Sequence, residues 1–179
     1  MPNVQDSLVI TATGEDRVGL VDDFTRHIVD AGCNIEESRM AMLGGHFALI
    51  MLLSGRWDAI AKLEGQLSDL GEQLGLAIIY RRTRERERGQ PVIPYYVESV
   101  SVDQPGIVNA LSGFFAQRGI NIEQLDTDTY PAPHSGTPMI SVRITVGIPA
   151  ATHIPTMRGD FLDHCDALNL DASFEPARG

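Results

Sequence analysis

The sequence is poor in cysteine, with only Cys33 and Cys165 among 179 residues. Neither has another Cys or a His at metal-ligand spacing, so neither a disulfide framework nor a thiolate metal site is expected. We expect each cysteine to be a buried free thiol.

Catalytic motifs are also missing. The five histidines form no H-x-x-x-H or H-E-x-x-H pair, and the sequence has no G-x-S-x-G or C-x-x-C. Gly14 and Gly19 have the spacing of a phosphate-binding loop, but Leu20 and Val21 follow where that loop needs Lys and Ser or Thr. The sequence therefore predicts no catalytic residue, no metal site and no cofactor.

Positive charge and long apolar runs are scarce as well. Fourteen basic residues against 24 acidic ones give a net charge of −10, which repels nucleic acid and anionic membranes. No apolar run is long enough to span a bilayer, and residues 1–13 do not resemble a leader peptide. We expect a cytoplasmic protein that does not contact DNA or membranes directly.

What the chain does contain is an internal repeat at a constant offset of 87 residues, as from Asp16 to Asp103. The recurring residues are Asp16, Gly19, Val21, Gly32, Asn34, Ile35 and Glu36, which return as Asp103, Gly106, Val108, Gly119, Asn121, Ile122 and Glu123. A repeat of this size predicts two small domains in tandem. We expect them at 1–83 and 94–179, joined by an arginine-rich linker at 84–93.

Hydrophobic periodicity predicts the order βαββαβ in each half, an α+β fold. In the first half we expect strands at 7–13, 34–43, 46–54 and 76–82, with a tight hairpin at Gly44-Gly45. Apolar residues three and four apart mark the helices; those of the first helix are Leu20, Val21, Phe24, Ile28 and Ala31. In the second half we expect strands at 95–102, 121–130, 139–147 and 170–174, a longer loop at 131–138, and a last helix interrupted by Gly159.

The third strands of the two halves differ in pattern. Apolar and polar residues alternate over 140–146, which predicts a sheet with one solvent-exposed face. Residues 47–53 are instead apolar throughout. The second face of the first sheet is therefore expected to be covered by the other repeat or by a second chain. We expect a homo-oligomer.

A corner between the first strand and first helix of each repeat is the main candidate binding site. Glycines at the start of a helix leave backbone N–H groups open to the carboxylate of a small ligand. Asp16 and Asp103 could instead cap the helices, Pro105 fits the first helical turn, and close packing could explain the glycines. The candidate residues are Asp16, Arg17, Val18, Gly19 and Leu20, with Asp103, Gln104, Gly106 and Ile107 in the second repeat.

Two asparagines extend the candidate site. Asn34 and Asn121 open the second strand of each repeat, each followed by an isoleucine, Ile35 or Ile122. An amide can accept from an ammonium and donate to a carboxylate, so asparagine suits a zwitterionic amino acid. A turn-forming role after glycine is the alternative.

Together, Asp-Arg-x-Gly-Leu-Val and Gly-x-Asn-Ile-Glu on a βαββαβ frame resemble the ACT domain, a ferredoxin-like fold that binds amino acids between paired domains. Within it, C-N-I-E-E-S-R-M-A-M-L-G at 33–44 is similar to the glycine cleavage system transcriptional repressors. This resemblance implies two ferredoxin-like ACT domains in a regulator that senses glycine and acts through a DNA-bound transcriptional activator protein. Val18 stands where proline is usual.

The second repeat suggests an alternative. Its D-Q-P-G, F-F-A-Q-R-G and N-I-E segments resemble the small subunit of acetolactate synthase, which would make the chain an allosteric subunit of a biosynthetic enzyme. The complete βαββαβ unit at the N-terminus argues against this. A regulatory fragment of an ACT-bearing enzyme, such as a deformylase, is a third interpretation.

Overall fold

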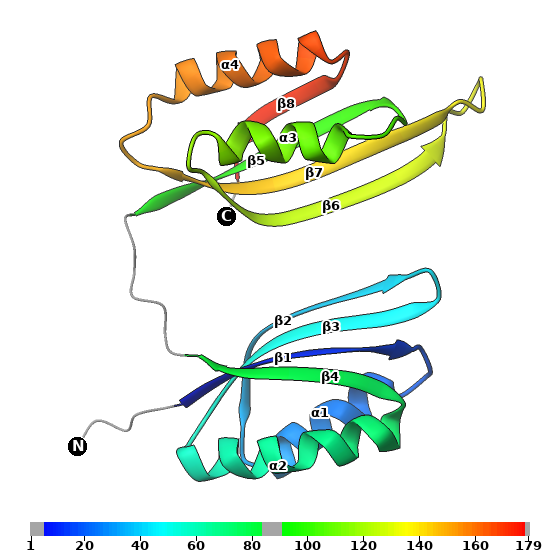
Figure 1. Cartoon of the computed structure of the whole chain (residues 1–179), viewed down its shortest axis with the longest axis vertical. Helices are drawn as coiled ribbons and strands as arrows, with labels where there is room; N and C mark the ends of the chain where they lie inside the picture. Colours follow the sequence, from blue (N-terminus) through cyan, green and yellow to red (C-terminus); the bar gives the residue numbers. More distant parts are fainter. Residues whose placement is uncertain (1–5, 84–90, 178–179) are drawn as a thin grey trace. The chain divides into compact units, whose positions relative to one another are not determined.

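The computed structural model describes residues 6–83 and 91–177. The chain divides into two compact units, Met1–Glu87 and Arg88–Gly179, shown together in Figure 1. Most of the expected linker, residues 84–90, lies outside the described residues. Each unit is described by itself.

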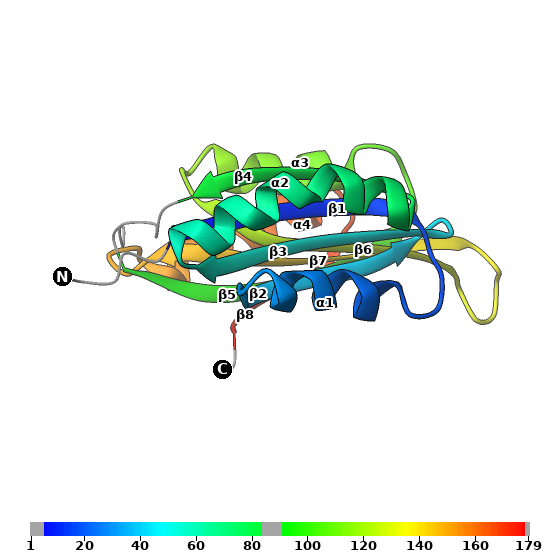
Figure 2. The ribbon, with the colours of Figure 1, turned by 90° about the horizontal axis from the view of Figure 1, so that it is seen from below.

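Unit 1 has the predicted order βαββαβ. Its sheet has the order β2-β3-β1-β4 with antiparallel pairing throughout, and both helices lie on one face of it (Figures 1 and 2). The elements are β1 (Asp6–Glu15), α1 (Leu20–Asp30), β2 (Asn34–Leu43), β3 (His46–Gly55), α2 (Trp57–Leu74) and β4 (Leu76–Thr83).

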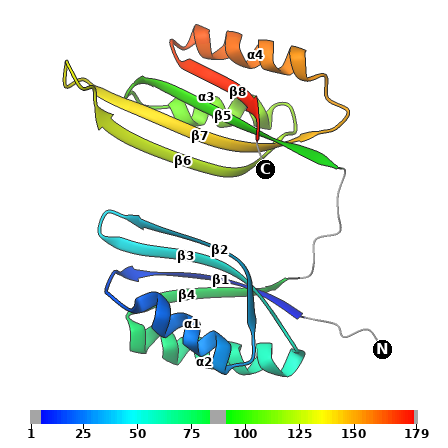
Figure 3. The ribbon, with the colours of Figure 1, turned by 180° about the vertical axis from the view of Figure 1, so that it is seen from behind.

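Unit 2 repeats this topology, with sheet order β6-β7-β5-β8 and both helices on one face (Figure 3). The elements are β5 (Val92–Val102), α3 (Ile107–Ala116), β6 (Asn121–Pro131), β7 (Pro138–Pro149), α4 (Ile154–Ala167) and β8 (Asp171–Pro176). The prediction of an α+β fold made of two ferredoxin-like units is confirmed. Strand β5 begins at Val92, earlier than the sequence pattern indicated.

Two details of the helices were predicted wrongly. Val21 is exposed and lies off the buried face of α1, which is formed by Leu20, Phe24 and Ile28. Helix α4 runs unbroken through Gly159, which is exposed. A glycine inside a helix costs only about 1 kcal/mol, and the burial of neighbouring apolar residues such as Phe161 outweighs it.

The hairpin between β2 and β3 follows the sequence prediction. Gly44 and Gly45 have φ of 58° and 80°, as a two-residue turn that follows the twist of its strands requires. The turn sets the β2–β3 register, in which Leu43 lies opposite His46 and Asn34 lies opposite Ser54.

The apolar strand β3 divides into two faces. Phe47, Leu49, Met51 and Leu53 are buried beneath the helices. Ile50 is on the other face and 47% exposed, in a row with Thr11 and Arg39. Within unit 1, the second face of the sheet is therefore mixed: Ile50 is exposed between a threonine and an arginine, and Ala48 and Leu52 are half-buried.

The corresponding row of unit 2 is charged, with Arg143 opposite both Glu98 and Asp126. On the helix side, the alternating residues from Ile140 to Val146 are buried. The second face of this sheet is polar, as the alternation predicted, but it is not fully exposed: Ser141 is 7% exposed, and Arg143 and Thr145 are half-buried.

Candidate ligand-binding site

The first corner connects β1 to α1 by a tight turn. Gly19 is the N-cap residue with φ of 86°, and the Leu20 N–H donates to the Arg17 carbonyl at 3.2 Å. Leu20 is buried and anchors the turn to the core, whereas Val18 is fully exposed. The equivalent corner of unit 2 has Gly106 as N-cap residue with φ of 97°.

The alternative that Asp16 and Asp103 cap the two helices is wrong. The N-cap positions are the glycines, and no described side chain caps either helix. The Asp103 backbone N–H instead donates to the Pro138 carbonyl at 2.9 Å. Helix α3 begins at Ile107, so Pro105 lies before the N-cap residue rather than in the first turn.

Close packing does not explain the glycines either. A Cβ on Gly19 would meet only Arg17 Nη1, at 4.0 Å, and one on Gly106 would meet nothing within 4 Å. Both positions have positive φ, which side chains on Cα disfavour. The glycines therefore allow the backbone to turn and add no side chain over the N–H groups of the first helical turn, of which that of Leu20 already donates to the Arg17 carbonyl.

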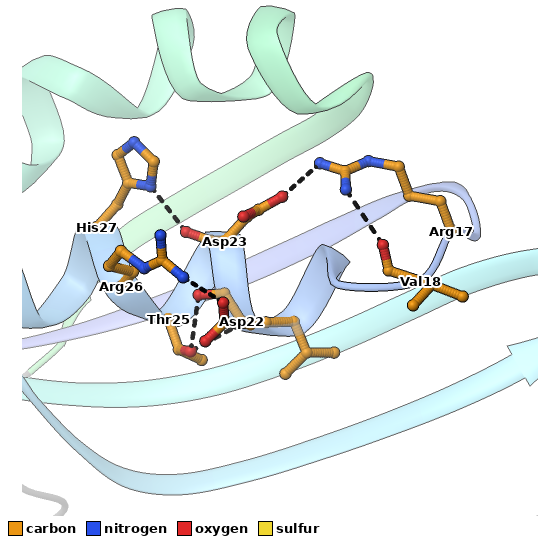
Figure 4. A network of polar contacts seen from close by, with 8 residues as sticks. Arg17, Val18, Asp22, Asp23, Thr25, Arg26 and His27 are labelled. Carbon is orange, nitrogen blue, oxygen red and sulfur yellow. Dashed lines mark hydrogen bonds and ion pairs between the residues drawn. The ribbon is translucent and has the colours of Figure 1, made fainter.

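The first turn of α1 carries two acids, each neutralised by an arginine (Figure 4). Arg17 Nη2 donates to Asp23 Oδ2 at 2.7 Å, and Arg26 pairs with Asp22. The hydrogen bond from Arg17 lowers the pKa of the Asp23 carboxyl below its usual value. The first turn of α3 has no acidic residue.

At Asn34, the structure reveals two residues that sequence reasoning missed. Asn34 Nδ2 donates to Glu36 Oε1 at 3.0 Å, and Ser54 Oγ donates to the same oxygen. Glu36 lies in a β-bulge, where the β2–β3 register shifts between Ile35 and Glu37. The hydroxyl of Ser54 and then the amide of Asn34 lower the pKa of the Glu36 carboxyl. The recurrence of Glu36 as Glu123 was the available signal in the sequence.

Unit 2 keeps the bulge but lacks the serine. The β6–β7 register shifts between Ile122 and Gln124, which leaves Glu123 in the bulge, and Asn121 lies opposite Gly147. A Cβ on Gly147 would lie 2.5 Å from Glu123 Oε1. Glu123 therefore covers the place that the Ser54 side chain occupies in unit 1.

The isoleucines after the asparagines have a structural role. Ile35 and Ile122 are partly buried and pack against the cores of their units. They hold the start of β2 and of β6 in place, and their contact with a ligand stays a prediction.

The two halves of the candidate site lie far apart within a unit (Figure 1). The corner follows Glu15, which lies opposite His46, whereas Asn34 lies opposite Ser54. His46 and Ser54 are eight residues apart on one strand, roughly 26 Å at about 3.3 Å per residue. One unit therefore does not bring its corner and its asparagine to one small ligand.

Other candidate chemistry is limited. Among the described residues, no group of three or more His, Cys, Asp or Glu could hold a metal ion. Cys33 and Cys165 are buried free thiols, as predicted. Within 6–83 and 91–177, no helix is both long and apolar enough to cross a membrane.

Comparison with known proteins adds the decisive observation. The ACT domain profile matches residues 6–80. The chain is 38% identical over 169 residues to the glycine cleavage system transcriptional repressor of Escherichia coli (strain K12), covering 94% of this chain and 89% of that one. The chain belongs to the glycine cleavage system transcriptional repressor family. The Shigella flexneri repressor matches to the same extent.

Solved structures agree with this family over the whole length. A crystal structure assigned as a glycine cleavage system transcriptional repressor is 30% identical, with a TM-score of 0.74, covering 98% of this chain and 99% of that one. A protein of unknown function from Galdieria sulphuraria is 29% identical, with a TM-score of 0.78 and coverage of 97% and 99%. The likeness includes unit 2, so it favours the repressor family over the enzyme-subunit alternative.

Proposed function

We propose that this chain is a non-catalytic amino-acid sensor of the glycine cleavage repressor type, built from ACT domains at 1–83 and 94–179. The observation that carries the proposal is the 38% identity to a named repressor over 94% of the chain. The family resemblance favours glycine as the ligand and the cytoplasm as the site of action.

The sensor acts through a DNA-bound transcriptional activator rather than through DNA. A net charge of −10 opposes the phosphate contacts that supply most of non-specific DNA affinity. A mobility-shift assay at physiological salt tests this route. We expect no shift of duplex DNA by the protein alone and a change only when the activator is present; a specific shift without it would contradict the proposal.

The corners offer the more direct site for the ligand carboxylate. Uncovered N–H groups and the positive end of the helix favour an anion at Gly19 and at Gly106. At the first corner, the Arg17 guanidinium is already paired with Asp23, and Asp16 and Val18 lie exposed on the turn. The counterparts in unit 2 are Asp103, Gln104, Gly106 and Ile107.

The ligand ammonium is assigned to asparagine. The asparagine and the corner of one unit are roughly 26 Å apart, so a site that uses both needs a residue from outside that unit, and we assign it to a second copy of the chain. Antiparallel pairing of edge strand β2 with the β2 of a second copy reverses the strand direction, which moves Asn34 towards the partner's corner. Met40 and Met42 are exposed on this edge strand, and an exposed edge favours pairing.

Thermal unfolding with a panel of amino acids tests the sensor. A ligand at about 100 times its dissociation constant adds about 2.7 kcal/mol to the stability of the folded state. We expect glycine to raise the melting temperature, and Asn34→Ala to reduce that rise. Gln66→Ala, which removes an exposed amide from α2, is the control and should respond like the parent. If no amino acid shifts the transition, the sensor proposal is wrong.

A further inference from the structure

A short chain of hydrogen bonds connects β3 to Asn34, a predicted ligand-binding residue. Ser54 is 5% exposed, and its hydroxyl donates to Glu36 Oε1 across the β2–β3 pair. The same oxygen accepts from Asn34 Nδ2 at 3.0 Å. The bulge at Glu36 brings the carboxylate to this position, because it interrupts the regular β2–β3 register between Ile35 and Glu37.

This chain determines which way the Asn34 amide points. An ionised carboxylate only accepts hydrogen bonds, so the group that Asn34 presents to Glu36 has to be its NH₂. The Oδ1 atom then faces away from Glu36 and is free to accept. The negative charge of Glu36 also makes this end of the unit favourable to an ammonium and unfavourable to a carboxylate.

We propose that Ser54 and Glu36 are positioning residues that preset the Asn34 amide to accept from the ammonium of a bound amino acid. The inference rests on the proposed function, because it concerns the same ligand. It adds which side chains orient the Asn34 amide towards the ammonium.

Unit 2 lacks this hydrogen-bond chain among its described residues. Gly147 occupies the place of Ser54, and the Glu123 carboxylate lies over it. Within the described part of the chain, the Asn121 side chain makes no hydrogen bond. Asn121 is therefore not preset, and the two repeats differ in ligand binding although they share the motif Gly-x-Asn-Ile-Glu.

Ser54→Ala provides the test, with Ser7→Ala as a matched control. Ser7 lies opposite Ser54 on β1, so both variants remove a hydroxyl from one row of the sheet. Ordering a side chain on binding costs about 0.5–1.5 kcal/mol, so Ser54→Ala should weaken glycine binding about two- to tenfold by titration calorimetry. Ser7→Ala should bind glycine like the parent.

Two further measurements separate positioning from a purely structural role. NMR titration should show the pKa of Glu36 rising towards its usual value in Ser54→Ala, because the strongest stabilising donor is gone. Glycolate, which replaces the ammonium by a hydroxyl, should lose less relative affinity in Ser54→Ala than glycine does.

The outcomes are distinguishable. If the parent binds glycine and Ser54→Ala binds it equally well, the positioning role is wrong while the sensor function stands. An equal loss in both serine variants would also overturn the positioning role, because a general disturbance of the sheet would then explain the loss. If the parent binds no amino acid, both proposals fall together.

Discussion

Replacing Gly19 with alanine should destabilise unit 1 for a reason that the backbone alone supplies. Gly19 has φ of 86°, and a residue with a Cβ pays about 1–2 kcal/mol in the left-handed region. The only neighbour of the added Cβ is Arg17 Nη1 at 4.0 Å, so no steric cost is added. Gly106→Ala should behave alike in unit 2, because φ is 97° and nothing lies within 4 Å.

Gly65→Ala is the matched control. Gly65 is an exposed residue inside α2, without positive φ and with nothing within 4 Å of an added Cβ. Alanine inside a helix is more favourable than glycine by about 0.5–1 kcal/mol, so this variant should be more stable than the parent. The two substitutions are chemically identical and should shift stability in opposite directions.

Thermal and urea unfolding measure the difference. For a domain of 60–100 residues, 1 kcal/mol corresponds to about 4–8 °C in melting temperature. Gly19→Ala should therefore melt about 4–16 °C below the parent, and Gly65→Ala a few degrees above it. A Gly19→Ala variant as stable as the parent would refute the argument, because the residue would then need no left-handed backbone.

Three other predictions concern the sheet, a thiol and oligomer formation. Ile50→Glu should change folding stability by less than about 0.5 kcal/mol because it alters an exposed position. Met51 is 3% exposed, so Met51→Glu should cost about 2–5 kcal/mol from lost packing alone. Urea unfolding compares the two variants, and equal losses of stability would contradict the assignment of faces. Burial raises the pKa of Cys165 from 9.0 to about 11, so the folded state keeps the thiol proton to a higher pH than the unfolded state, and folding stability should fall as pH rises across that interval. Cys165→Ala should flatten this pH dependence when unfolding is measured at several pH values. An unchanged slope would contradict the assignment to Cys165. Met40→Glu should shift the chain towards monomer in light scattering if copies pair through β2, and a parent that is already monomeric at micromolar concentration would contradict that pairing.

Much of the fold could be predicted because it depends on local patterns. Gly44 and Gly45 predicted a turn with positive φ, and both residues adopt it. The alternation along β7 predicted which of its residues are buried beneath the helices. Val21 and Gly159 were misjudged because the exact start of a helix and its tolerance of glycine depend on packing against the rest of the unit.

The candidate site was predicted less completely. The repeat identified the corners and the asparagines, but it did not show that they lie at opposite ends of a unit, since helix α1 carries the chain back along the sheet. Asp16 was considered as a cap because aspartate is common at that position, yet the cap is Gly19. Glu36 and Ser54 are 18 residues apart in sequence and meet only through the β2–β3 register.

The sequence by itself determined the duplication, the βαββαβ order, the acidic character and the position of the turns, because each of these depends on composition or on residues close together in the chain. Only the tertiary structure decided which residues distant in the sequence come into contact. Strand pairing put Ser54 beside Glu36 and left Gly147 under Glu123. The positive φ of Gly19 and Gly106, with open space around both, explained these glycines by backbone conformation instead of packing. Long-range register and backbone angles are set by the packing of the whole unit, so local patterns carry too little information to specify them.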